Sequence, residues 1–214
     1  MNLELGGYTY IFDCIYVIPE YRGKGVFKSL FNSGLEIAKK DWNLVSLKLI
    51  VDKANEGAIK IARKFGFQQG ISNPKIIVAE QSFHGRTLAT LSATGNKKVQ
   101  EGFAPLVEGF IRVPFGDVEA IQEAAINNPD IVAILIEPIQ GEGGVNTAPQ
   151  GFSYLDEVRA LCNQHNWLMM LDEIQTGNGR TGKYFAYQHT NIIPDVMTTA
   201  KGLGNGFPVG AVMT

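Results

Sequence analysis

Apolar runs alternate with segments of helical periodicity from about residue 54 to residue 214. Apolar and β-branched runs predict strands at 76–80, 109–113, 131–136, 167–171, 195–199 and 208–213. Apolar residues spaced three and four apart predict helices at 54–64, 117–127 and 153–165. Several runs are apolar throughout, which is typical of parallel strands that are buried on both faces. This pattern predicts an α/β fold, with a mostly parallel sheet and helices on both faces.

The pattern before residue 54 is different. Aromatic and β-branched residues predict a strand at 8–18, and apolar spacing predicts a helix after a turn that contains Arg22-Gly23-Lys24-Gly25. Residues 44–51 have the pattern of the next strand. A glycine turn between a strand and a helix can bind a pyrophosphate, because free backbone N–H groups point at the anion.

The composition of the chain is typical of a folded globular protein and argues against several other classes. The chain has 214 residues, of which 45% are hydrophobic and 19% charged, so it can build a core and is not disordered. The net charge is −2, and no dense run of Lys and Arg predicts a nucleic-acid surface. Two distant cysteines favour a reducing compartment. The sequence shows neither a signal peptide nor an apolar run of membrane-spanning length, so we expect a soluble, cytoplasmic protein with no membrane partner.

Side chains that can take part in chemistry follow two of the predicted strands. Asp172 closes the apolar run 167–171, and Lys201 precedes a glycine-rich stretch at 202–206. In α/β sheets, ligands bind outside the carboxyl ends of the strands, so both side chains are well placed for a site. His165 and His189 do not have the spacing of metal ligands, and we expect no metal.

Residues 8 to about 67 resemble the acetyl-CoA-binding half of the GNAT acetyltransferases. The resemblance rests on Val17–Gly25 and on Asn55-Glu56-Gly57-Ala58, which lead to Lys64-Phe65-Gly66-Phe67. It implies a partial GNAT β-α-β-α unit at residues 1–57. In that unit the coenzyme pyrophosphate would be cradled by Arg22, Gly23, Lys24 and Gly25. The alternative is an ordinary turn that carries basic residues.

Residues 54–214 resemble the class III pyridoxal-phosphate aminotransferases, and the acetylornithine type in particular. Four motifs in family order carry the resemblance: Ser82–Thr87, Glu137–Gly144, Leu171–Gly177, and Lys201 in its glycine setting. The resemblance implies part of the large domain of fold type I, with pyridoxal 5′-phosphate as cofactor. Its substrates would be small amino and keto acids, acetylornithine and 2-oxoglutarate in arginine biosynthesis, and the parent family is homodimeric.

The resemblance also implies a role for each motif residue. Lys201 would bond covalently to the cofactor and act as a general base, and Asp172 would keep the ring nitrogen protonated. Phe83 and Ile174 would pack on the two ring faces, and Gln175 would donate to the phenolic oxygen. Substrate binding would fall to Arg86, by a bidentate contact with a carboxylate, and to Glu142. His84 either lines the site or is structural. Glu173 either lies behind the site or lies on the surface, and Glu137 would cap or orient the loop at Pro138.

The sequence departs from both families. Leu49–Lys53 follow the acetyltransferase pattern in place of the aminotransferase loop that holds the cofactor phosphate. The aminotransferase C-terminal domain, which would supply the partner of Glu142, is not in the sequence. We therefore expect an inactive fusion of two truncated enzymes. The competing hypotheses are an active aminotransferase and a GNAT N-acetyltransferase or coenzyme-A-binding module.

Overall fold

The computed structural model describes residues 2–5, 8–13, 47–50, 54–205 and 209–214. The Arg22–Gly25 turn and the predicted helix that follows it lie outside the described residues. So does the second half of the strand predicted at 8–18.

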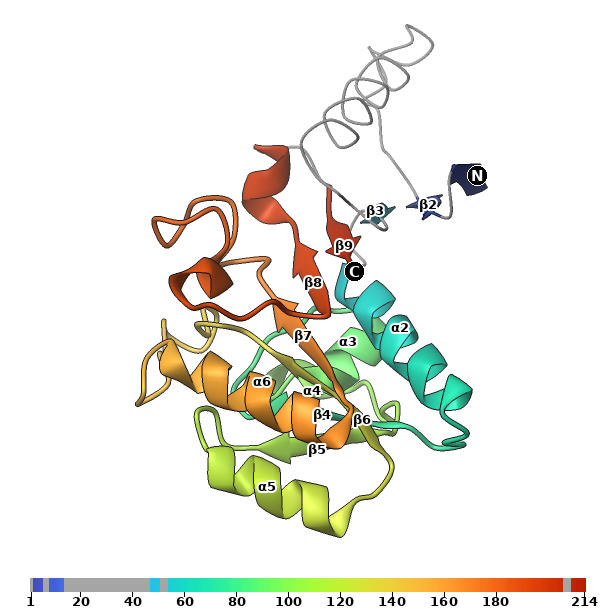
Figure 1. The fold of residues 1–214 in the computed structure, drawn as a ribbon, viewed down its shortest axis with the longest axis vertical. Coiled ribbons are helices and arrows are strands. Elements are labelled where there is room, and N and C mark those ends of the chain that lie inside the picture. The colour runs from blue at the N-terminus through green and yellow to red at the C-terminus, as the bar shows by residue number, and fades with distance from the viewer. Residues whose placement is uncertain (1, 6–7, 14–46, 51–53, 206–208) are drawn as a thin grey trace, which may run out of the picture.

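The strands that the structure describes form one sheet in the order β1-β2-β3-β9-β8-β7-β6-β4-β5 (Figure 1). Five consecutive strands of this order, from β8 to β5, are parallel to one another. They are β4 (Lys75–Ala79), β5 (Phe110–Val113), β6 (Ile131–Ile136), β7 (Leu168–Asp172) and β8 (Val196–Thr199). The mostly parallel sheet is confirmed.

The other four strands extend the sheet beyond β8. β9 (Ala211–Met213) is antiparallel to both β8 and β3 (Leu47–Ile50). β2 (Tyr8–Asp13) lies parallel to β3, and β1 (Asn2–Leu5) lies antiparallel to β2. The sequence pattern did not predict β1.

Helices cover both faces of the parallel strands (Figure 1). α5 (Val118–Asn127) and α6 (Ser153–His165) pack on one face, and α2 (Ala54–Gln68) and α3 (Leu88–Ala93) pack on the other. The short helix α4 (Lys97–Gln100) and the 3₁₀ turns η2 (Ala186–His189) and η3 (Lys201–Gly204) complete the described elements. The sequence pattern did not predict α3, α4, η2 or η3, because each is too short for periodicity to show.

Alternation along the central strands divides the core in two. In β4, Ile77 and Ala79 face the α5–α6 layer, whereas Ile76 and Val78 face the α2 layer. Every residue of β6 is buried. This burial explains the unbroken apolar runs in the sequence, because a strand covered on both faces has no polar side.

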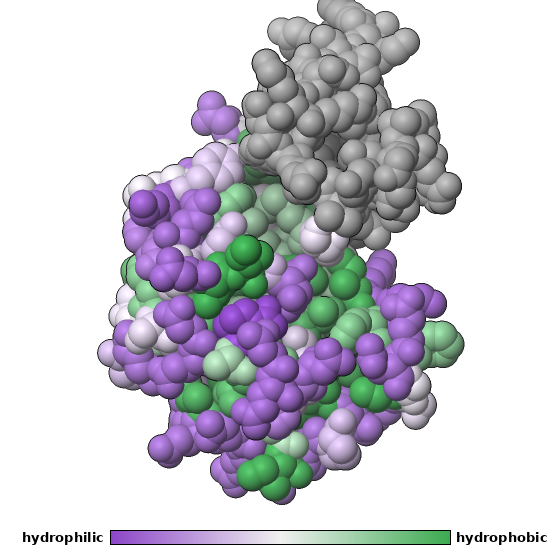
Figure 2. All heavy atoms as spheres, in the orientation of Figure 1, coloured by the Kyte–Doolittle hydropathy of each residue, from purple (hydrophilic) through white to green (hydrophobic). Residues whose placement is uncertain are grey.

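Hydrophilic residues dominate the face shown in Figure 2, and apolar residues appear there as separate patches. Within the described ranges, no helix combines the length and apolar character that crossing a membrane requires. The same residues contain no cluster of three or more His, Cys, Asp or Glu side chains that could hold a metal ion.

Candidate functional site

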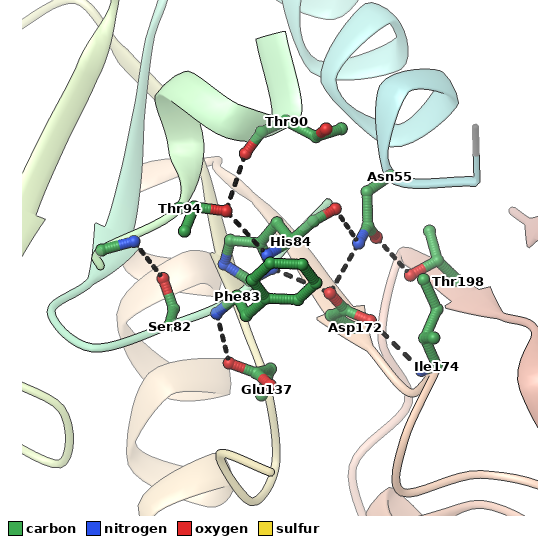
Figure 3. Close-up of polar contacts among 11 residues, drawn as sticks. Asn55, Ser82, Phe83, His84, Thr90, Thr94, Glu137, Asp172, Ile174 and Thr198 are labelled. Atoms are coloured by element: carbon green, nitrogen blue, oxygen red, sulfur yellow. Dashed lines mark hydrogen bonds and ion pairs between the residues drawn. The ribbon is translucent and has the colours of Figure 1, made fainter. Parts of the chain in front are cut away.

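The candidate site lies at the carboxyl ends of four adjacent parallel strands. The motif containing Phe83 and His84 follows β4, Glu137 follows β6, Asp172 ends β7, and Lys201 follows β8. Because carboxyl ends of parallel strands meet at one sheet edge, residues up to 118 positions apart are brought together. Figure 3 shows Phe83, Asp172 and Ile174 around this edge.

Asp172 is the hub of a buried hydrogen-bond network (Figure 3). Its Oδ2 accepts from Asn55 Nδ2 at 2.6 Å and is 2.8 Å from His84 Nδ1. Its Oδ1 accepts from the Ile174 backbone N–H at 3.1 Å. Three donors from three segments therefore fix this carboxylate in one orientation.

Asn55, in the first turn of α2, connects Asp172 with two further segments. Its amide Nδ2 also donates to the His84 carbonyl at 2.8 Å, and its Oδ1 accepts from the Thr198 hydroxyl at 2.6 Å. Asn55 and Thr198 are both buried. Sequence reasoning gave neither residue a role in the site, although Asn55 begins the Asn55-Glu56-Gly57-Ala58 motif.

His84 is fully enclosed beside Asp172. Burial is the largest influence on its pKa and lowers it, but the hydrogen bond and charge of Asp172 and the charge of Glu137 raise it more. The net result is a pKa above the usual 6.5, which favours the imidazolium form. His84 Nε2 is buried and has no hydrogen-bond partner. The sequence left open whether His84 lines the site or is structural; in the structure it is buried against Asp172 and does not line the cavity beside Lys201.

Glu137 lies behind Phe83. Its Oε2 accepts from the Phe83 backbone N–H at 3.1 Å, and it also accepts from the Gly141 backbone N–H. Burial raises the pKa of this carboxyl to about 7, and the nearby His84 and the two N–H donors counteract only part of that effect. Glu137 thus joins the Phe83 motif to the loop after β6.

Glu173 is buried and ties the turn after β7 to η2. Its carboxylate accepts from the Thr176 hydroxyl at 2.6 Å, the Ala186 N–H at 2.9 Å and the Tyr187 N–H at 2.8 Å. Burial raises the pKa of Glu173, and the charge of Asp172 adds to the rise. The open question about Glu173 is settled against a surface position.

A cavity of about 850 Å³ lies beside this network. Ile174, Gln175 and Lys201 line it, together with parts of the loops at 139–145 and 176–181. A side chain at Gly141 would meet Gln175 Cδ at 2.7 Å, so the Gln175 amide would have to move from its present position to make room for it. Lys201 is exposed and has φ +45°, an unusual conformation for a non-glycine residue that is typical of functional sites. It lies in η3, two residues beyond the end of β8.

The two predicted substrate-binding residues are exposed. The Arg86 guanidinium carbon lies 5.6 Å from the centre of the half-buried Phe83 ring, within cation–π range. Glu142 lies in the loop after β6. Neither residue lines the cavity beside Lys201, and neither Asp172 nor Phe83 lines it, whereas Ile174, Gln175 and Lys201 do. Asp172 is connected to the cavity wall through the backbone N–H of Ile174.

Two family models match this chain, one over its N-terminal segment and one over the rest. Residues 52–214 match the family described as aminotransferase class-III, and residues 3–67 match the acetyltransferase (GNAT) family. The two matches overlap at residues 52–67, which include nearly all of α2.

Curated relatives are similar over the larger segment. The chain is 60% identical to acetylornithine aminotransferase from Nitrosomonas europaea over 161 residues, which cover 75% of this chain and 40% of the relative. It is 51% identical to acetylornithine aminotransferase 1 from Bordetella pertussis with the same coverage. The chain therefore spans less than half the length of these relatives.

Solved structures share the fold. Ornithine aminotransferase from Toxoplasma gondii superposes with a TM-score of 0.78 at 33% identity, covering 86% of this chain and 44% of that one. N-acetylornithine aminotransferase from Stenotrophomonas maltophilia gives 0.67 at 35% identity, covering 94% and 46%. The fold, the order of the motifs and the match over residues 52–214 agree, and the chain belongs to the class-III aminotransferase family.

Proposed function

We propose that residues 54–214 form the cofactor-binding part of a pyridoxal-phosphate-dependent aminotransferase, and residues 1–57 a GNAT-like segment. The observation that carries the proposal is the grouping of Ile174, Gln175 and Lys201 around one cavity beside the anchored Asp172. The similarity to acetylornithine aminotransferases favours acetylornithine or a similar ω-amine as amino donor, 2-oxoglutarate as acceptor and a place in arginine biosynthesis. A homodimer is part of the same proposal.

The residues present fit pyridoxal phosphate. A carboxylate has about four lone-pair sites, and Asp172 uses three of them within the protein. One site remains for the protonated nitrogen of a pyridine ring. Phe83 and Ile174 are both partly exposed at the same sheet edge, as apolar groups that contact a ligand must be.

Each side chain has a defined task in this proposal. Pyridoxal phosphate, when bound, supplies the electron sink that stabilises a carbanion. Asp172 holds the proton on the ring nitrogen through a charge-assisted hydrogen bond. Gln175 orients the ring by an amide hydrogen bond, and Phe83 with Ile174 excludes water from its faces. Lys201 anchors the cofactor and moves a proton at the substrate carbon. Arg86 and Glu142 are proposed to bind the substrate.

Covalent attachment to Lys201 tests the proposal directly. Pyridoxal phosphate is added to the purified chain, the bond is reduced with borohydride, and the modified lysine is located by mass spectrometry. We expect the adduct on Lys201 and its loss in Lys201→Ala. Lys183→Ala is the matched control, because Lys183 is an exposed lysine outside the cavity. An adduct that persists in Lys201→Ala would refute the assignment.

Turnover is tested separately from cofactor binding. Glutamate formation from 2-oxoglutarate is measured with acetylornithine as amino donor. This assay is separate from the binding test because a chain that spans 40% of its relatives' length can bind cofactor without turning over. We propose that the isolated chain has no appreciable turnover. Turnover at rates typical of aminotransferases would contradict that part of the proposal.

A second candidate function is supported by the GNAT match at residues 3–67. We propose that Arg22, Gly23, Lys24 and Gly25 bind the pyrophosphate of acetyl-CoA. Calorimetric titration with coenzyme A tests this site, with Arg22→Ala and Lys24→Ala as the weakened variants. Equal binding by these variants and the parent chain would exclude the assignment.

A further inference from the structure

We propose that Asn55 is a positioning residue for Asp172. The Thr198 hydroxyl holds the oxygen side of the Asn55 amide, and the nitrogen side holds the Asp172 carboxylate and the His84 backbone in place. The proposal deepens the cofactor site described above and rests on that proposed function. It assigns a task to the one helix that both family matches share.

The direction of the network follows from its chemistry. The His84 carbonyl and the Asp172 carboxylate can only accept, and both lie within hydrogen-bond distance of one Asn55 amide atom, at 2.8 and 2.6 Å. That atom must be the nitrogen, because only the nitrogen can donate twice. The remaining amide oxygen must accept, and the Thr198 hydroxyl, 2.6 Å away, is its donor.

This directionality separates positioning from mere space filling. Asn55 and Asp have nearly the same shape, so Asn55→Asp keeps the packing of the site. It replaces the donor with a carboxylate oxygen about where Nδ2 lies, 2.6 Å from Asp172 Oδ2. Two carboxylates this close cannot both be ionised without a large cost, so the pair retains a proton.

Among the described residues, few charged groups lie near Asp172 and the carboxylate that Asn55→Asp would introduce. His84 contacts Asp172 from the loop after β4, Glu137 faces His84 from the end of β6, and Glu173 follows Asp172. On α2 itself, Glu56 bonds the Thr87 hydroxyl at 2.6 Å. The positive charge of His84 is shared already with Glu137 and Asp172, so a third carboxylate adds net repulsion.

The first experiment needs no cofactor. Thermal unfolding of the parent chain and Asn55→Asp is compared between pH 5 and pH 8. The added carboxyl group has a higher pKa in the folded than in the unfolded protein, so its destabilising effect increases as pH rises through the folded pKa. We expect the gap in Tm to widen with pH. A gap that is constant with pH would overturn the proposal.

Asn128→Asp is the matched control. Asn128 is a partly buried asparagine whose Oδ1 accepts from the Lys75 ammonium at 3.1 Å, so the new carboxylate would face a cation. Its gap in Tm from the parent chain should therefore not widen with pH. If Asn128→Asp and Asn55→Asp behaved alike, the pH effect would not come from Asp172, and the proposal would fail.

A second variant covers the case in which Asn55→Asp does not fold. Thr198→Val removes the hydroxyl but adds no charge, so the Asn55 oxygen loses its donor and the amide is held only through its nitrogen. We expect the Asn55 side-chain N–H signals, protected from solvent exchange in the parent chain, to exchange faster in an NMR experiment. Unchanged protection in Thr198→Val would contradict the proposed hold of Thr198 on the Asn55 amide.

Cofactor titration links the network to the site. We expect pyridoxal phosphate to bind about tenfold more weakly, or worse, to Asn55→Asp than to the parent chain at pH 8. Equal affinity would show that Asn55 does not act on the cofactor through Asp172. If the parent chain itself bound no cofactor, the proposed function would fail, whereas the pH profile would still test the hold of Asn55 on Asp172.

Discussion

Glu137, His84 and Asp172 are three ionisable side chains buried side by side at the edge of the sheet. A buried charge is costly unless it is paired, and one histidine cannot fully neutralise two carboxylates. The site relieves the imbalance by raising the pKa of Glu137 to about 7 and by holding a proton on His84. Charge at this site therefore changes near neutral pH.

We predict that the stability of the chain falls as pH rises from about 5 to 8. The pKa of Glu137 rises from 4.5 to about 7 on folding, so its stabilising contribution is complete below pH 4.5 and lost as pH passes 7. At about 1.4 kcal/mol for each unit of pKa, this effect is on the order of 3–4 kcal/mol. The raised pKa values of His84 and Glu173 act in the same direction.

Glu137→Gln tests this account, because the amide oxygen can still accept from the Phe83 N–H while the side chain no longer titrates. Its urea-unfolding free energy should depend less on pH than that of the parent chain, with a residual slope from His84 and Glu173. Parallel pH profiles for the two proteins would show that Glu137 does not titrate in this range.

At the scale of elements, α2 is the helix in which the two family matches overlap. Asn55 in its first turn bonds Asp172 and His84, and Ala58, Ile59 and Ala62 are buried against the sheet. Near its other end, Gly66 lies against Pro74 and Val132. The helix can lie this close to the sheet only because residue 66 has no side chain.

We predict that Gly66→Ala destabilises the chain despite the better helix propensity of alanine. A Cβ at residue 66 would lie 2.6 Å from Pro74 Cβ and 2.9 Å from Val132 Cγ1, and relieving such overlap costs roughly 1–3 kcal/mol. The gain in propensity is about 1 kcal/mol, so steric overlap should outweigh it. Urea unfolding would measure the difference.

Gln68→Ala is the control for that variant. Gln68 is the exposed last residue of α2, and its substitution should change stability by less than about 0.5 kcal/mol. A stabilised Gly66→Ala protein would mean that α2 packs less closely on the sheet than the structure shows.

At the scale of the whole molecule, one apolar surface stands out beside β8 and β9. A cavity of about 500 Å³ is lined mostly by aromatic residues, methionines and Ile193, of which Ile193 is 76% exposed. Exposed apolar surfaces that are contiguous favour association, whereas single exposed residues do not. The coloured part of the face drawn in Figure 2 is mostly hydrophilic, with separate apolar patches.

We predict that the purified chain self-associates through this surface as its concentration increases. Ile193→Lys should lower the apparent mass measured by light scattering after gel filtration. Ile126→Lys is the control, because Ile126 is 83% exposed but lies on α5, outside the cavity at β8 and β9. Equal effects of the two substitutions would locate the association elsewhere.

The sequence by itself determined the alternation of strands and helices, because burial on both faces leaves unbroken apolar runs such as 131–136. It also placed Asp172 at a strand end, because a polar residue that closes an apolar run marks where the strand leaves the core. The short elements α3, α4, η2 and η3 were missed, since fewer than two helical turns carry no clear period.

Tertiary structure alone decided which polar residues meet. Asn55 and Asp172 are 117 positions apart, and Asn55 and Thr198 are 143 apart, so no local pattern could have paired them. The burial of His84 and Glu173 was likewise undetermined, because either residue is as common on a surface as in a site. Side-chain type and strand order set the chemistry available, but the parallel sheet brings the carboxyl ends of distant strands to one edge, and that packing selects the residues that form the site.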